Sequence, residues 1–104
     1  MNLEEFAQHV LQERREYLAK MYSQRQADAE QVEVIPGRVY TKIDRGSPFN
    51  NDEHPGQGYL MIETATGNIY GIKAYGKVHK GHAYGTLETV HDWYWGDFYP
   101  RRKP

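Results

Sequence analysis

The residues with the clearest capacity for chemistry lie between Gly67 and Leu87. This stretch repeats Tyr-Gly three times and carries three lysines and two histidines, but no acidic residue. Lysines interleaved with aromatic rings are typical of a surface that binds an anion carrying a flat ring, such as a nucleotide. Repeated glycine in such a pattern indicates a bulge, a tight bend or a close backbone approach. The pattern favours a binding surface over a catalytic centre.

Alternation along an extended strand gives this surface an expected geometry. Lys73, Tyr75 and Lys77 share parity, so a regular strand would place all three on one side of a sheet. The alternative is an ordinary solvated face, because lysine is common at exposed strand positions. The ligand-binding residues that we predict are Arg38, Lys42, Lys73, Tyr75, Lys77, His79, Lys80, His82 and Tyr84.

His79 and His82 flank Lys80-Gly81, which we read as a two-residue turn between strands. The two rings would then face each other across the turn, since cross-strand Cβ atoms lie about 4.5–5.5 Å apart. A metal site would need a third ligand, which only His54, His91 or a carboxylate could supply. A cationic turn that receives phosphate and a solvated hairpin are the other two interpretations. We predict no metal and no cofactor.

Sequence signals for catalysis are thin. The chain has no cysteine and neither the G-x-S-x-G nor the H-E-x-x-H motif. Histidines and carboxylates are present, but nothing in the sequence fixes their geometry. We therefore expect a binding protein rather than an enzyme.

Length and composition indicate one domain over residues 1–104. Its parts are a helical N-terminal region (1–35), an antiparallel sheet (36–91) and an aromatic, basic tail (92–104). The 104 residues are 38% hydrophobic and 26% charged, with a net charge of −1. That balance hides a partition, because residues 1–37 carry −3 and residues 38–104 carry +2. Local fields would therefore attract an anionic partner more than the net charge would.

The most strongly patterned element is a helix over residues 2 to about 22. Asn2 is a good N-cap with Glu5 three residues on, and apolar residues follow at helical spacing. Arg14 interrupts the apolar stripe, either as a side chain at its edge or as an anion contact. Residues 23–35 are helix-compatible and end in a turn at Pro36-Gly37.

The remainder of the chain reads as strands. We expect strands at 38–44, 59–63, 69–79 and 82–90, with a long loop at 45–58. The fold class is α+β, with the N-terminal helix packed on a strongly bent, four-stranded antiparallel sheet. A small barrel is the alternative, because glycines punctuate the longest strand.

Five large aromatic residues close to the C-terminus could stack a ligand ring, complete the core or bury a subunit contact. They are Trp93, Tyr94, Trp95, Phe98 and Tyr99. A small core, an apolar helix stripe and this aromatic end together favour a homo-oligomer. No apolar run approaches a membrane span, and the acidic N-terminus does not resemble a signal peptide.

Four segments resemble a family of small, largely uncharacterised tailed-bacteriophage proteins. They are Tyr40-Thr-Lys-Ile-Asp44, Gly67-Asn-Ile-Tyr-Gly-Ile-Lys73, Tyr84-Gly-Thr-Leu87 and Trp93-Tyr-Trp95-Gly96. The similarity covers roughly residues 36–99 and implies a phage origin and a place in the host cytoplasm. It assigns no functional residue.

Composition and resemblance together lead to one leading hypothesis. The protein would capture an anionic, nucleotide-like ligand, with a role in countering host defence. The alternatives are a nucleic-acid-binding accessory protein and an inhibitor of a host defence protein. The net charge of −1 weighs against the first alternative, because nucleic-acid-binding domains are typically basic.

Overall fold

The computed structural model describes residues 1–47, 57–74 and 77–104. The fold is α+β, with helices preceding an antiparallel sheet. The helices are α1 (Leu3–Met21) and α2 (Gln24–Ala29). The sheet strands are β1 (Gln31–Ile35), β2 (Tyr40–Gly46), β3 (Gln57–Glu63), β4 (Asn68–Ala74) and β5 (Lys77–Thr86). The short 3-10 helix η1 (Val90–Asp92) precedes a small hairpin of β6 (Trp93–Tyr94) and β7 (Arg101–Arg102).

The start of α1 confirms the cap predicted from the sequence. The Glu5 N–H donates to the Asn2 side chain at 2.8 Å, and the Asn2 N–H donates back to Glu5 at 3.1 Å. These two bonds satisfy donors that the first helical turn leaves without partners. The helical interpretation of residues 23–35 is wrong in its second half. α2 ends at Ala29, and β-branched Val32, Val34 and Ile35 form β1 instead.

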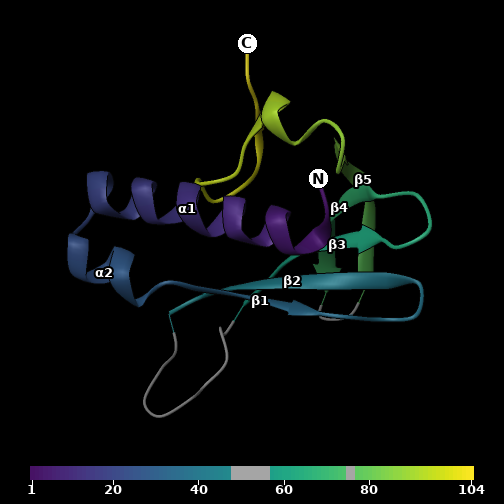
Figure 1. The fold of residues 1–104 in the computed structure, drawn as a ribbon, viewed down its shortest axis with the longest axis horizontal. Coiled ribbons are helices and arrows are strands. Elements are labelled where there is room, and N and C mark those ends of the chain that lie inside the picture. The colour runs from purple at the N-terminus through teal and green to yellow at the C-terminus, as the bar shows by residue number, and fades with distance from the viewer. Residues whose placement is uncertain (48–56, 75–76) are drawn as a thin grey trace.

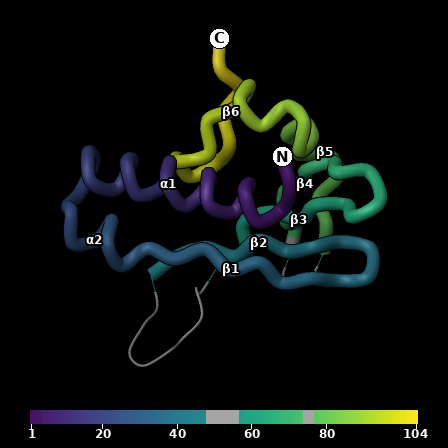
Figure 2. The backbone as a smooth tube through the Cα atoms, viewed as in Figure 1, coloured from purple at the N-terminus to yellow at the C-terminus, as the bar shows by residue number. Residues whose placement is uncertain are grey.

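The sheet has five strands in the order β1-β2-β3-β4-β5, all neighbours antiparallel, and the described residues form no closed barrel. β1 and β2 run alongside α1, whereas β4 and β5 cross it, so the sheet twists strongly from one edge to the other (Figure 1). Figure 2 shows the chain after β5 returning toward α1. None of the described helices is long and apolar enough to cross a membrane.

The predicted single strand over 69–79 is also wrong, because β4 ends at Ala74 and β5 begins at Lys77. Lys80-Gly81 therefore lies inside β5 and is not a turn. Tyr70 pairs with Ala83 and Gly71 with His79, so residues 80–82 have no partner and form a bulge. The predicted loop at 45–58 is shorter, since both of its ends belong to strands. Its residues 48–56 lie outside the described part.

The core lies between α1, the sheet and residues 95–100, which connect β6 with β7 and which we call the C-terminal segment. Phe6 and Val10 of α1 pack against buried aliphatic residues of the sheet and against Trp95, all with essentially no exposure. The Phe6 and Trp95 rings meet edge to face at 4.9 Å. The indole N–H of Trp95 donates to the Val90 carbonyl at 3.0 Å, so its polar atom is satisfied inside the core.

This packing yields a stability prediction for Phe6. Phe6→Ala should lower the free energy of unfolding by about 3–5 kcal/mol, because it removes a fully buried ring and leaves a cavity. Val39→Ala is the matched control, since Val39 is exposed and should cost far less. Denaturant titration measures both. Similar small losses for the two variants would show that α1 does not cover the sheet.

Candidate functional site

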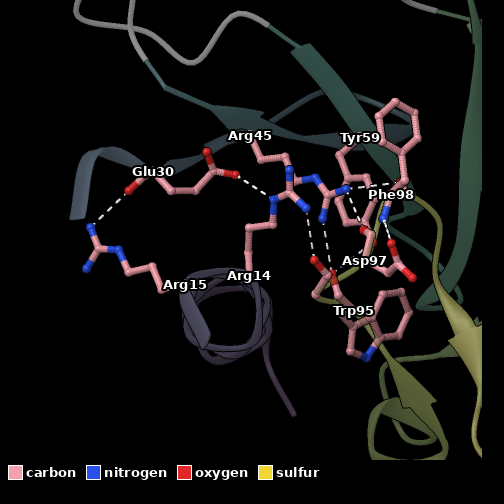
Figure 3. Close-up of polar contacts among 9 residues, drawn as sticks. Arg14, Arg15, Glu30, Arg45, Tyr59, Trp95, Asp97 and Phe98 are labelled. Atoms are coloured by element: carbon pink, nitrogen blue, oxygen red, sulfur yellow. Dashed lines mark hydrogen bonds and ion pairs between the residues drawn. The ribbon is translucent and has the colours of Figure 1, made fainter. Parts of the chain in front are cut away.

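Arg45, near the end of β2, is a buried cation whose partners are main-chain oxygens. It alternates with Thr41 and Ile43 on the face of β2 that meets the core, and only 6% of it is exposed. Its Nη1 donates to the Trp95 carbonyl at 3.1 Å, and its Nη2 donates to the carbonyls of Asp97 (2.7 Å) and Phe98 (3.0 Å). One side chain from the sheet thus fixes the C-terminal segment (Figure 3).

Arg14 of α1 holds the same segment from the helix side. Its Nη1 donates to the Gly96 carbonyl at 3.0 Å, and its Nε pairs with the Glu30 carboxylate at 2.9 Å. Arg15 donates to the Glu30 carbonyl at 2.9 Å, so Glu30 lies between the two arginines, as Figure 3 shows. Arg14 therefore does more than border the apolar stripe of α1.

Tyr59 lines the site because β3 contains a bulge. Ile43 pairs with Leu60 and Asp44 with Gly58, which leaves Tyr59 as an extra residue without a partner in β2. Its ring lies 3.6 Å from the Arg45 guanidinium, and its hydroxyl donates to the Trp95 carbonyl at 3.1 Å. Burial raises the pKa of Tyr59, so the phenol stays neutral and donates this bond at physiological pH.

These residues border a cavity of about 220 Å³, which we call the Arg45 cavity. Its walls come from α1, from the four adjacent strands β2 to β5 and from the C-terminal segment. The lining side chains with polar atoms or rings are Arg14, Arg45, Gln57, Tyr59, His82, Tyr84, Phe98 and Tyr99. Gly71 allows β5 to form its wall, because a Cβ there would lie 3.2 Å from the Cβ of His82.

The electrostatics of the Arg45 cavity leave a net positive charge on its wall. Glu30 pairs with Arg14, and Asp97 pairs with Arg101 at 3.3 Å, so no acid within the described residues pairs with Arg45. Burial lowers the pKa of Arg45 and neighbouring Arg14 acts in the same direction, whereas Tyr59 and the more distant acids Glu30 and Asp97 oppose the shift. The Arg45 guanidinium still remains charged at neutral pH, because the usual pKa of arginine lies far above 7. Carbonyl dipoles and the Tyr59 ring solvate this charge without neutralising it.

His79 and His82 come together, although not across a turn. The bulge of β5 stacks their rings at 4.0 Å with an angle of 14° between the planes. Tyr84 follows, and its ring meets Trp93 edge to face at 5.6 Å. His82 and Tyr84, two of the predicted ligand-binding residues, line the Arg45 cavity.

The predicted basic residues are spread over the sheet and do not lie in one group. The register places Arg38, between β1 and β2, at the opposite end of the sheet from Lys73 and Lys77. Lys42 lies on the face of β2 that points away from α1. Lys80 approaches that face too, since a hydrogen bond with Tyr40 raises its pKa. Tyr75 lies outside the described residues.

One sequence pattern near the site matches part of a phosphate-binding motif. Gly71 to Lys77 has the G-x-x-x-x-G-K spacing of a phosphate-binding loop, but Val78 stands where that motif has Ser or Thr. In the structure Lys77 begins a strand rather than a helix, so the motif lacks its structural context.

The residues predicted from the sequence did not include Arg45. The signal that could have found it is its parity with Ile43, which places Arg45 on the core face of β2. The described residues contain no cluster of three metal-ligating side chains.

Comparisons of the chain with protein-family models, with curated proteins and with solved structures give no match. The site must therefore be interpreted from its own geometry.

Asp44, on the face opposite the Arg45 cavity, is a buried carboxyl whose Oδ1 accepts no hydrogen bond in the described structure. Burial raises its pKa, neighbouring Glu33 adds to the rise, and Lys42 opposes it. A carboxyl with a raised pKa in the folded state favours folding most when protonated. Its contribution is complete below the pKa of the unfolded chain and is lost as the pH rises through the folded value.

Asp44→Asn should therefore raise the melting temperature at neutral pH, because it removes a buried charge. The gain over the wild type should shrink as the pH falls toward the acid range, where Asp44 is protonated. Thermal melts of both proteins across a pH series measure this difference. Asp92→Asn, the same change at an exposed position, is the control and should show no such trend. A gain that stays constant with pH would contradict the assignment.

Proposed function

We propose that this protein binds a small anion of nucleotide type in the Arg45 cavity and holds it without chemical change. The observation that carries the proposal is the positive charge of Arg45, which is buried in the cavity wall. Its hydrogen-bond partners are carbonyls, and no acidic side chain of the described residues forms an ion pair with it. Buried charges in proteins are normally paired, so an incoming anion would supply the missing partner.

Arg45 also keeps donors for such a ligand. A guanidinium has five N–H bonds, and the described residues accept three of those on Arg45. The Nε–H and one Nη1–H remain for an oxyanion, within the described structure. Arginine suits phosphate and carboxylate because its planar donors match their oxygens.

The aromatic walls favour a ligand that also carries a ring. Tyr59, Tyr84, Phe98 and Tyr99 border the cavity together with His82. Stacking of a base on such side chains contributes about 1–3 kcal/mol. The volume of about 220 Å³ is below the roughly 300–1,000 Å³ of pockets for drug-sized ligands. The cavity therefore fits one ring or one phosphate group, with the rest of the ligand at its mouth.

A biological role follows from the resemblance to phage proteins. A compact phage protein that holds a nucleotide without consuming it would lower the level of a host signalling nucleotide. We include this counter-defence role in the proposal, and it depends on the resemblance rather than on the cavity. Incubation of the protein with the bound nucleotide should return that nucleotide unchanged.

The binding test uses calorimetry with a panel of mononucleotides, cyclic dinucleotides, inorganic phosphate and single-stranded DNA. His82→Glu places a negative charge at the rim of the cavity and should weaken nucleotide binding by at least tenfold, or about 1.4 kcal/mol. Arg38→Glu is the control, because it changes charge at the opposite end of the sheet and should leave affinity unchanged. Both positions are exposed, so both variants should keep the melting temperature of the wild type.

Lys77→Glu separates the Arg45 cavity from the basic strand predicted by sequence. Lys77 does not line the cavity, so its reversal should have little effect. Loss of binding in Lys77→Glu with intact binding in His82→Glu would move the site to the strand lysines and contradict the cavity. Tight binding of single-stranded DNA that falls steeply with salt would instead indicate a nucleic-acid-binding protein.

A further inference from the structure

Four large exposed apolar side chains lie at the C-terminal end of α1 and in the C-terminal segment. Met21, Tyr22, Phe98 and Tyr99 are 58%, 66%, 67% and 63% exposed. Within the described residues only Val39, at 57%, belongs to the same class, and it lies between β1 and β2. Single exposed apolar residues are ordinary, but a contiguous group marks an interaction site.

Tyr17 joins the two halves of this group. A hollow of about 320 Å³ is lined by Tyr17, Leu18, Tyr22 and Phe98 among others. A groove of about 630 Å³ on the other side of Tyr17 includes Met21, Tyr94 and Asp97. Ring contacts link Tyr17 with Tyr22 at 6.4 Å and Phe98 with Tyr99 at 5.4 Å. We call the surface formed by Tyr17, Met21, Tyr22, Phe98 and Tyr99 the α1–tail surface.

The charges around the α1–tail surface favour a second copy of this chain over a polyanion. The groove has two acids, Glu16 and Asp97, and two bases, Lys20 and Arg101. The hollow likewise has one acid, Glu30, and one base, Arg14, which pair with each other. Nucleic acid and anionic membranes select surfaces of a single positive sign. A surface with equal numbers of both signs on an apolar base can instead complement itself across a twofold axis.

Hydrogen bonds hold the backbone of the C-terminal segment, which carries Phe98 and Tyr99 of this surface. Arg45 binds the carbonyls of Asp97 and Phe98, while the Phe98 ring points away from the guanidinium in Figure 3. A ring held on a constrained backbone loses less conformational entropy when a partner docks. This exposed ring is therefore preorganised for a protein contact.

We propose that a second copy of this chain docks on the α1–tail surface to form a twofold dimer. The inference goes beyond the proposed function, because the dimer requires no ligand. The two are adjacent, however, since Phe98 and Tyr99 also line the Arg45 cavity. A partner copy would therefore lie next to the mouth of the cavity.

Sedimentation of the protein without nucleotide tests the dimer. The wild type should sediment as a dimer at micromolar concentration, and Met21→Glu should weaken the dimer at least tenfold. Val39→Glu is the matched control, because it places the same charge at an apolar residue of similar exposure. Val39 directly precedes β2, whereas Arg45, which holds the C-terminal segment, lies near the other end of that strand. The Val39→Glu variant should stay dimeric. A wild type that stays monomeric over the micromolar range, or a Val39→Glu variant that dissociates as readily, would overturn the proposal.

Chemical cross-linking gives a second readout that does not depend on weakening the contact. The chain has no cysteine, so a single introduced thiol is the only site for a maleimide cross-linker. Tyr22→Cys should yield covalent dimers, and Val39→Cys should yield almost none. Equal yields from the two variants would place the contact elsewhere or show that the collisions are random.

Discussion

The burial of one guanidinium is the constraint on which the rest of this structure depends. Arg45 lies on the core face of β2, where a charge is costly unless hydrogen bonds solvate it. The chain meets this need with three carbonyls of the C-terminal segment, those of Trp95, Asp97 and Phe98, rather than with an acid. Arg14 takes the intervening carbonyl of Gly96, so helix and sheet hold the same few residues from two sides. The position of that segment then fixes both the core and the candidate site.

The core gains Trp95 from this arrangement. The same residue gives its carbonyl to Arg45 and Tyr59 and its ring to Phe6, so polar and apolar packing are joined at one position. The Arg45 cavity forms where the segment passes β5, and the exposed rings of Phe98 and Tyr99 follow directly. Ligand binding and self-association are thus proposed for adjacent parts of one constrained segment.

Sequence reasoning reached the elements that depend on local chemistry. The cap at Asn2 is such a case, because its partner Glu5 lies within one helical turn. The apolar stripe of α1 is another, because its helical spacing is visible in the sequence although its packing partners lie in the sheet. It missed β1, whose polar neighbours in α2 extended the helical pattern too far. It placed a turn at Lys80-Gly81, since glycine marks a bulge and a turn equally well. The Arg45 site was out of reach for another reason. Its acceptors are backbone carbonyls about fifty residues away, and no side-chain pattern encodes a carbonyl.

The central claim is that Arg45 carries a buried positive charge that an anionic ligand completes, and arginine side-chain NMR tests it most directly. In protein labelled with ¹⁵N-arginine, Arg45 and Arg14 should give side-chain N–H signals that exchange slowly with water, because carbonyls and Glu30 hold their hydrogens. Titration with a mononucleotide should shift the Arg45 signals at the same concentrations that saturate binding. Saturable binding with unchanged Arg45 signals would contradict the account.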